Sequence, residues 1–271
     1  GHAQGRLSAM LGQASALQNA GHATRALDKY QESIAWGEQL IQRFGEQPRL
    51  LMDLGRALGN LGNVLQYLNR EAEANDAWAR SLDLARKRVE LQPTQANSHS
   101  DLIFSLNNYV TYNLQKNRLA EAAALIDEAS SLAEQALLVA PSDQAILTSI
   151  RTFYANQTLL HCFRQNHEQA LAEIDNIVGL QPDKPNHLVF AAKTAARCQL
   201  SVLGNLHELF GTPGDEAIAE RYAEKSLALL STAKDLGFRD FAWLRRQPEF
   251  SGLFTRPEFI ERFDAQGDTE R

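Results

Sequence analysis

The stretch ANDAWARSLDLARKRV, residues 74–89, decides the fold. Its small and apolar side chains recur at intervals of three or four residues, which places them on one face of a helix. They are Ala74, Ala77, Trp78, Ser81, Leu82, Ala85 and Val89. No segment of the chain alternates polar with apolar residues as a half-buried strand does. The sequence therefore predicts an all-α protein.

The pattern of this helix returns every 48 residues. A small residue, a bulky residue and a third, usually small, residue recur at fixed spacing in four segments. The first positions are Ala26, Ala74, Ala122 and Ala170, the bulky ones are Tyr30, Trp78, Ile126 and Ile174, and the third are Ser33, Ser81, Ala129 and Ile177. Repeats of this length are typical of stacked helical hairpins, in which each hairpin buries its apolar face against the next. We therefore expect an α-solenoid of about five long hairpins, four regular and a fifth that diverges.

The prolines and the aromatic residues set the expected boundaries. Prolines that end or begin helices separate the hairpins, which we place at about 7–47, 48–92, 93–140, 141–182 and 184–235. In the fifth, Thr212 with Pro213 and Asp215 marks a helix start. Residues 236–263 are rich in Phe and are expected to form short capping helices, because the last hairpin would otherwise expose its apolar face.

The two ends of the chain are expected to lie outside the array. Residues 1–6 are assigned to an N-terminal tail that begins with the remnant of a tag, and residues 264–271 to a disordered tail. The chain has no initiator Met, which indicates a fragment of a longer protein.

Composition excludes several classes of protein. The chain is 44% hydrophobic and 22% charged, as in folded soluble proteins. Its net charge of −6 argues against nucleic acid or an anionic membrane as the main partner. No run approaches the roughly eighteen apolar residues of a membrane span. Cys162 and Cys198 are too few for a disulfide framework and are predicted to be buried thiols.

The small–bulky–small pattern resembles the tetratricopeptide (TPR) repeat. In that family two helices pack through an Ala, an aromatic residue and a second Ala on the second helix, and a Pro closes the unit. HEAT and armadillo repeats are nearer in length, at about 40–47 residues against 34 for the common TPR, so another α-solenoid is the alternative. We favour the TPR, since lengthening each helix by about two whole turns keeps its packing face in register.

A closer resemblance rests on GNLG at 59–62, NNYV at 107–110 and the closing segment 219–259, AERYAEKSLALLSTAKDLGFRDFAWLRRQPEFSGLFTRPEF. These are similar to the C-terminal TPR arrays of bacterial serine/threonine protein kinases. The glycine-rich loop, HRD and DFG motifs of the kinase domain are absent from this chain. The resemblance implies a regulatory or targeting module of such a kinase. We expect it in the cytoplasm, but if the parent kinase is membrane-anchored the array could lie on either side of the membrane.

The candidate site follows from the resemblance, because the first helix of each TPR lines the concave face. Asn60, Asn108 and Asn156 are 48 residues apart and would form a ladder there. A primary amide offers both donors and an acceptor, so it can pair with a peptide backbone whatever the peptide's side chains. The full candidate set is Arg56, Asn60, Asn63, Tyr67, Asn107, Asn108, Thr111 and Asn156. In the alternative, the asparagines bond the backbone of the adjacent hairpin and only set the packing between hairpins. Gly62 is expected to serve packing, because it lets the second helix approach the first.

We therefore predict a non-catalytic protein–protein interaction scaffold that binds an extended peptide or a partner protein. The alternative is a sensory module that binds a small molecule or signal peptide and regulates an attached effector. No enzyme, metal or cofactor is indicated: there is no nucleotide-binding loop and no metal-binding spacing of histidines. His161, beside Cys162, shares the position of Leu17 and Leu65 and is predicted to pack between helices. The sequence leaves the oligomeric state open.

Overall fold

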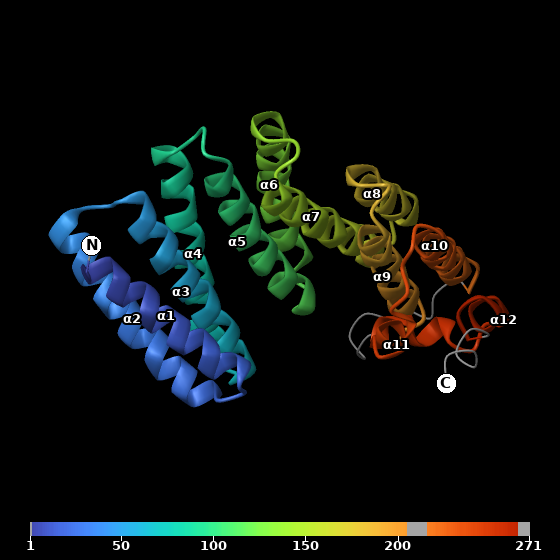
Figure 1. Ribbon diagram of the computed structural model, residues 1–271, viewed down its shortest axis with the longest axis horizontal. Coiled ribbons are helices and arrows are strands. Elements are labelled where there is room, and N and C mark those ends of the chain that lie inside the picture. Colours follow the sequence, from blue (N-terminus) through green and yellow to red (C-terminus); the bar gives the residue numbers. More distant parts are fainter. Residues whose placement is uncertain (1, 205–215, 265–271) are drawn as a thin grey trace. The chain divides into compact units, whose positions relative to one another are not determined.

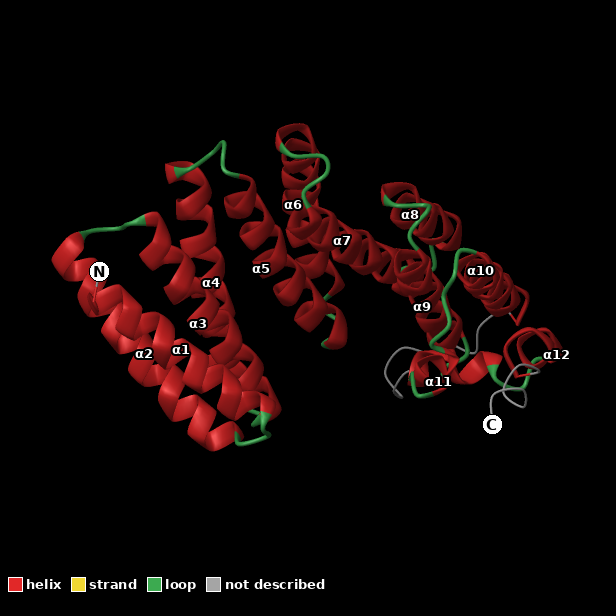
Figure 2. Cartoon of the chain, in the orientation of Figure 1, coloured by secondary structure: helices red, strands yellow, loops and turns green. Residues whose placement is uncertain are grey.

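Helices joined by short turns make up nearly all of the chain in a computed structural model, which describes residues 2–204 and 216–264 (Figures 1 and 2). No strand occurs within those residues, so the all-α prediction is confirmed. The ten long helices of this part are α1 (His2–Asn19), α2 (Ala23–Phe44), α3 (Pro48–Tyr67), α4 (Glu71–Leu91), α5 (Ala96–Gln115), α6 (Leu119–Val139), α7 (Gln144–Phe163), α8 (His167–Leu180), α9 (Pro185–Val202) and α10 (Glu216–Asp235).

The helix starts reproduce the 48-residue period. The second helices of the hairpins begin at Ala23, Glu71, Leu119 and His167, and three first helices begin at Pro48, Ala96 and Gln144. The small, bulky and third positions predicted from the sequence are all buried in the four regular hairpins. The repeat therefore determines both where the helices begin and which face packs.

Each regular hairpin turns through one residue in the left-handed backbone region. These residues are Gly21, Asn69, Asn117 and Gln165, again 48 apart, with φ of 77°, 58°, 55° and 60°. At Gly21, the residue's own N–H bonds to Gln18 O at 3.0 Å and the next N–H bonds to Leu17 O at 2.9 Å. The same pair of bonds recurs at the other three turns. This is the Schellman pattern, which satisfies the last carbonyls of a helix and reverses the chain.

The chain divides into two compact units, residues 1–112 with 127–150 and residues 113–126 with 151–271. In the first unit, α1 packs on α2, α2 on α3 and α3 on α4. Its core holds Tyr30 and the Trp78 ring, whose centroid lies 4.5 Å from that of Tyr112. Ser81 links the two helices of its hairpin, because its hydroxyl donates to Gly55 O at 2.8 Å.

In the second unit, α9 is the central helix and packs against α10, α8 and the segment after α10. The hydroxyl of Ser226 on α10 donates to Ala192 O on α9 at 2.9 Å, as Ser81 does in its own hairpin. Residues 236–264 contain the short helices α11 (Phe241–Arg245), η1 (Pro248–Leu253), α12 (Pro257–Phe259) and η2 (Ile260–Asp264). Phe250 and Leu253 of η1 are fully buried, and η1 packs against α9.

The N-terminal boundary of the array differs from the prediction. Helix α1 already begins at His2, so residues 2–6 belong to a helix, not to the tail assigned to them. The sequence did not predict this helix start, because a tag-like beginning carries no helix signal of its own. The helix start assigned to Thr212, Pro213 and Asp215 lies outside the described residues, as do 265–271 of the predicted tail.

Candidate functional site

A cavity of about 490 Å³ opens in the first unit between α3 and α5. Residues of α4 and the beginning of α7 complete its lining. We refer to it as the α3–α5 cavity. Three of the predicted site residues line it, namely Arg56 and Asn60 from α3 and Asn108 from α5. Asn60 and Asn108 share this space because residues 48 apart occupy the same position on successive first helices, and Arg56 precedes Asn60 by about one turn of α3.

The other predicted residues of this unit do not line the cavity. The side chain of Asn107 is 3% exposed, and its Nδ2 donates to Ser149 O at 2.8 Å. Thr111 donates to Asn107 O within its own helix at 2.8 Å. Tyr67 is 76% exposed at the end of α3, and Asn63 is half-buried. For Asn107 the structural alternative therefore holds, because its amide nitrogen is committed to the backbone of α7.

The third residue of the predicted ladder is Asn156. Asn156 belongs to the second unit, where its side chain is 5% exposed. It is not part of the α3–α5 cavity. Two of the three asparagines, Asn60 and Asn108, line this cavity.

Asn60 and Asn108 retain hydrogen-bonding capacity. Burial raises the pKa of the Tyr30 phenol, and hydrogen bonds with the side chains of Ser15 and Asn60 offset part of that rise. The Tyr30 hydroxyl itself donates to Gln18 Oε1 at 2.8 Å. The amide of Asn108 has no hydrogen bond to any of the described residues. Each primary amide has two donor hydrogens and an oxygen that accepts, so both side chains can bind a further backbone group.

A buried ion pair holds the α4 and α5 sides of the cavity together. Arg88, 4% exposed, donates to the Asp101 carboxylate and to Asn97 Oδ1 at 2.9 Å. Arg56 reaches the same carboxylate from α3, with Nη2 3.1 Å from Asp101 Oδ1. Asp101 thus bridges two arginines on two other helices. The guanidinium of Arg56 keeps further N–H donors, and its side chain is 57% exposed.

Sequence reasoning missed Phe104, Arg88 and Asp101. The Phe104 ring is 55% exposed although it lines the cavity. The 48-residue spacing could have identified two of them, because Phe104 stands 48 residues after Arg56 and Asp101 stands 48 residues after Asp53. Asp53 is buried, and burial raises its pKa more than Arg49, the Ser8 hydroxyl and other nearby groups lower it.

The remaining sequence candidates lie in the second unit. Cys162 and Cys198 are both buried and free, as predicted. His161 is half-buried. At the start of α8, His167 Nδ1 lies 3.1 Å from the Tyr222 hydroxyl. Residues 2–204 and 216–264 contain no group of three or more His, Cys, Asp or Glu side chains placed to hold a metal ion. None of the helices described there has the length and apolar character needed to span a membrane.

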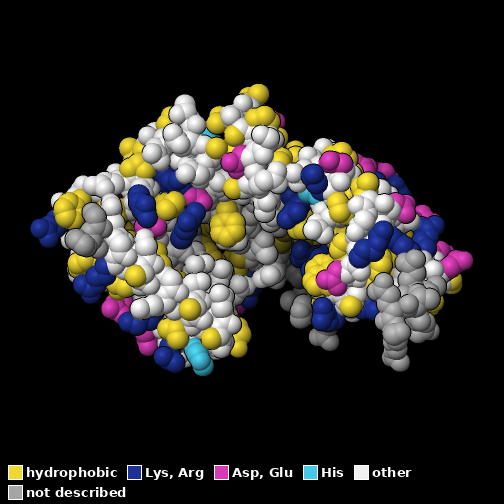
Figure 3. All heavy atoms as spheres, viewed as in Figure 1, with side chains coloured by type: hydrophobic (Ala, Val, Ile, Leu, Met, Phe, Trp, Pro, Cys, Tyr) yellow, Lys and Arg dark blue, Asp and Glu magenta, His cyan; other side chains and the backbone are white. Residues whose placement is uncertain are grey.

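The surface of the first unit is mixed in character. On the face drawn in Figure 3, basic, acidic and hydrophobic side chains are interspersed over its helices.

Comparison with known proteins gives similarity of a distant kind. No protein-family model matches the sequence, and no curated protein matches it. Among solved structures, the chain is similar to TTC0263, a thermophilic TPR protein of Thermus thermophilus. That match has 15% identity and a TM-score of 0.39, and covers 82% of this chain and 99% of the other. A second, described as "MamA RS-1 ArsTM double mutant", has 16% identity and a TM-score of 0.39, and covers 80% and 93%. Because both TM-scores are below 0.5, the description of the fold rests on the helices and their packing and not on these matches.

Proposed function

We propose that this chain is a protein-interaction module that binds an extended peptide segment in the α3–α5 cavity. The observation that carries the proposal is that Asn60 and Asn108, one repeat apart, line the same cavity with amide capacity to spare. An extended peptide presents its own N–H and C=O groups at regular intervals. The two amides, one on α3 and one on α5, can each pair with one such group.

The amides alone give little affinity. Each net hydrogen bond is worth about 0.5–1.5 kcal/mol, so two or three of them supply roughly 1–4 kcal/mol. Phe104 adds an exposed ring on which an apolar side chain of the peptide can pack. Arg56 adds guanidinium donors that fit a carboxylate. The preferred segment therefore carries an apolar residue and an acidic residue on an otherwise tolerant backbone.

The test is selection from a random linear-peptide display library on the immobilised chain. Selected peptides are then measured by fluorescence anisotropy against the wild type, Asn60→Ala/Asn108→Ala and Asn63→Ala. We expect a loss of about tenfold or more in the double variant. Asn63→Ala is the matched control, since it removes an amide from α3 that does not line the cavity.

Two outcomes would count against the proposal. If the double variant binds the selected peptides as the wild type does, the asparagines play no part in recognition. If Asn63→Ala weakens binding equally, the loss comes from helix α3 in general. Circular dichroism of each variant confirms that the helices are intact.

A sensory role is the second candidate, and the volume of the cavity favours it. About 490 Å³ lies within the range of small-molecule sites, roughly 300–1,000 Å³. Thermal stabilisation by a metabolite panel, lost in Asn60→Ala/Asn108→Ala, would support this role. Stabilisation by the selected peptides alone would favour the first.

The resemblance of residues 219–259 supports a finer proposal about the parent protein. We propose that the module regulates or targets a bacterial serine/threonine protein kinase in the cytoplasm. The complete reading frame tests this directly. A kinase domain with HRD and DFG motifs on the same chain would support it, and its absence would contradict it.

A further inference from the structure

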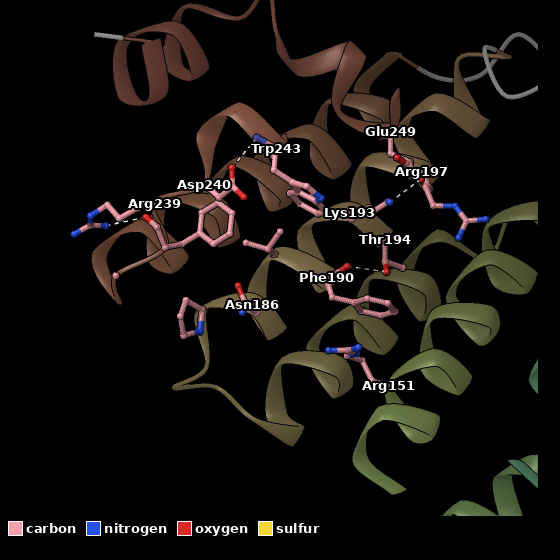
Figure 4. A pocket seen from close by; sticks show the side chains of 14 residues that line it. Arg151, Asn186, Phe190, Lys193, Thr194, Arg197, Arg239, Asp240, Trp243 and Glu249 are labelled. Carbon is pink, nitrogen blue, oxygen red and sulfur yellow. Dashed lines mark hydrogen bonds and ion pairs between the residues drawn. The ribbon is translucent and has the colours of Figure 1, made fainter. Parts of the chain in front are cut away.

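A larger cavity, of about 860 Å³, lies in the second unit (Figure 4). Helix α9 forms one wall, and the turn 237–240 with Trp243 of α11 and Glu249 of η1 forms another. Arg151 reaches it from α7. We call it the basic cavity.

Cations outnumber carboxylates in its lining. Arg151, Lys193, Arg197 and Arg239 line the cavity together with Asp240 and Glu249, which is four positive charges against two negative. The chain as a whole has a net charge of −6, so this excess is local. A cavity wall of one sign concentrates ions of the opposite sign.

Two of the four cations are already bound to groups of the protein. Lys193 Nζ lies 3.0 Å from Glu249 Oε1 and 3.1 Å from Gln247 Oε1. Arg239 donates to Lys234 O at 2.6 Å and to Phe238 O at 2.8 Å. The Lys193 contacts join α9 to the segment 247–249, and both Arg239 bonds come from its Nη1.

Arg151 and Arg197 have no carboxylate partner among the described residues. The guanidinium of Arg151 lies over the Phe190 ring, 4.2 Å from its centroid, as Figure 4 shows. Its Nε is buried without a hydrogen bond, and burial lowers the pKa of the group. Arginine nevertheless stays protonated in proteins. Arg151 is half-buried without a carboxylate partner, and an oxyanion beside it would offset the cost of desolvating its charge.

The same cavity offers flat apolar surface. Phe190 and Trp243 both line it, and Lys193 lies 6.0 Å from the Trp243 ring centroid. The volume fits an organic ligand of the size that cavities of roughly 300–1,000 Å³ usually hold. A bare inorganic ion would leave most of this space unfilled.

We propose that the basic cavity binds a small organic oxyanion that carries a flat ring. Its carboxylate or phosphate oxygens accept hydrogen bonds from Arg151 and Arg197, and its ring packs on Trp243. Guanidinium groups suit both kinds of oxyanion, because their paired N–H donors match two oxygens at once. The proposal is independent of the α3–α5 cavity, which belongs to the other unit.

The experiment is isothermal titration of the full chain, in phosphate-free buffer, with four probes. Benzoate and benzamide differ in charge at nearly constant shape. Phenyl phosphate and inorganic phosphate differ in the ring. We expect benzoate or phenyl phosphate to bind, and benzamide and inorganic phosphate to bind at least about tenfold more weakly. Whichever of the two aromatic anions binds more tightly identifies the oxyanion.

Variants locate the site. Arg151→Gln/Arg197→Gln should lower the affinity for the tighter probe about tenfold or more. Arg246→Gln is the matched control, because it removes an exposed charge that does not line the cavity. Trp243→Leu should lower the affinity for the aromatic anion and leave that for inorganic phosphate unchanged.

Several results would overturn the proposal. They are equal binding of benzoate and benzamide, no binding of any probe at millimolar concentration, and equal losses in Arg246→Gln and the double variant. A far-ultraviolet spectrum of the double variant shows whether it has folded. If it has not, Arg197→Gln alone replaces it, since Arg197 is half-buried at the surface of α9.

Discussion

The indole of Trp78 lies directly against the backbone of Gly62. A Cβ added to Gly62 would lie 2.5 Å from Trp78 Nε1 and 2.7 Å from its Cδ1. Glycine inside a helix costs about 1 kcal/mol relative to alanine. Here it lets α3 and α4 approach around a ring that is itself packed on Tyr112. The predicted packing role of Gly62 is therefore confirmed.

This contact predicts opposite effects for two Gly→Ala substitutions. Gly62→Ala should lower the free energy of unfolding by about 2–3 kcal/mol, because the rigid indole must shift. Gly12→Ala should raise it by about 0.5–1 kcal/mol, since an added Cβ in α1 meets nothing within 4 Å. Urea unfolding of both variants measures the difference. A neutral Gly62→Ala would mean that the Trp78 ring relocates without cost.

The four left-handed turns predict a stabilising substitution. A left-handed conformation costs about 1–2 kcal/mol for an ordinary residue and much less for glycine or asparagine. Of the turn residues Gly21, Asn69, Asn117 and Gln165, only Gln165 belongs to neither class. Gln165→Gly should therefore raise the midpoint of thermal unfolding, with a gain of about 0.5–1 kcal/mol. Gly21→Ala should lower it by a similar amount, and equal signs for the two would contradict this reading.

These turns also show which features of the fold can be predicted from the sequence and which cannot. The side-chain repeat predicted the helices and their buried faces because packing requires a fixed residue type at each position. The turn conformation escaped prediction, because Gly, Asn and Gln look unrelated until the backbone is known. The candidate site was predicted in part for a related reason. Asn60 and Asn108 occupy equivalent positions, but burial of Asn107 and Asn156 depends on the neighbouring helices, which spacing does not describe.

Because the Asp101 carboxylate bridges two arginines beside the α3–α5 cavity, we expect its removal to lower the free energy of unfolding strongly. Asp101→Ala leaves the buried Arg88 with Asn97 alone, so unfolding should become easier by about 3 kcal/mol. Glu168→Ala breaks the exposed two-bond pair with Arg221 at the start of α8 and should lower stability much less. Chemical unfolding at neutral pH compares the two. Equal effects would show that burial of Arg88 does not matter.

Buried His187 predicts loss of stability in mild acid. Burial lowers its pKa below the ordinary value, and Arg151 lowers it further, although the Ile177 carbonyl, 2.5 Å from Nε2, acts in the opposite direction. The unfolded chain therefore takes up a proton at about pH 6.5 that the folded chain does not. Stability is fully present above that pH and falls as the pH drops through and below it. His187→Gln keeps a donor for Ile177 and should flatten this dependence between about pH 6.5 and 5. An unchanged slope would assign the effect to other groups.

For Arg151 in the basic cavity, we expect the wild type and the Arg151→Met variant to exchange their order of stability when ligand is added. Arg151→Met removes a half-buried cation that has no carboxylate partner and keeps an apolar stem over Phe190. Without ligand, its unfolding free energy should equal or exceed that of the wild type, by up to about 1 kcal/mol. A bound oxyanion stabilises only the protein that binds it, by about 1.4 kcal/mol at ten times its Kd. With benzoate or phenyl phosphate at that level, the wild type should therefore become the more stable of the two. Thermal unfolding with and without the probe measures both orders, and a variant that is less stable under both conditions would make Arg151 a structural residue instead of a ligand-binding one.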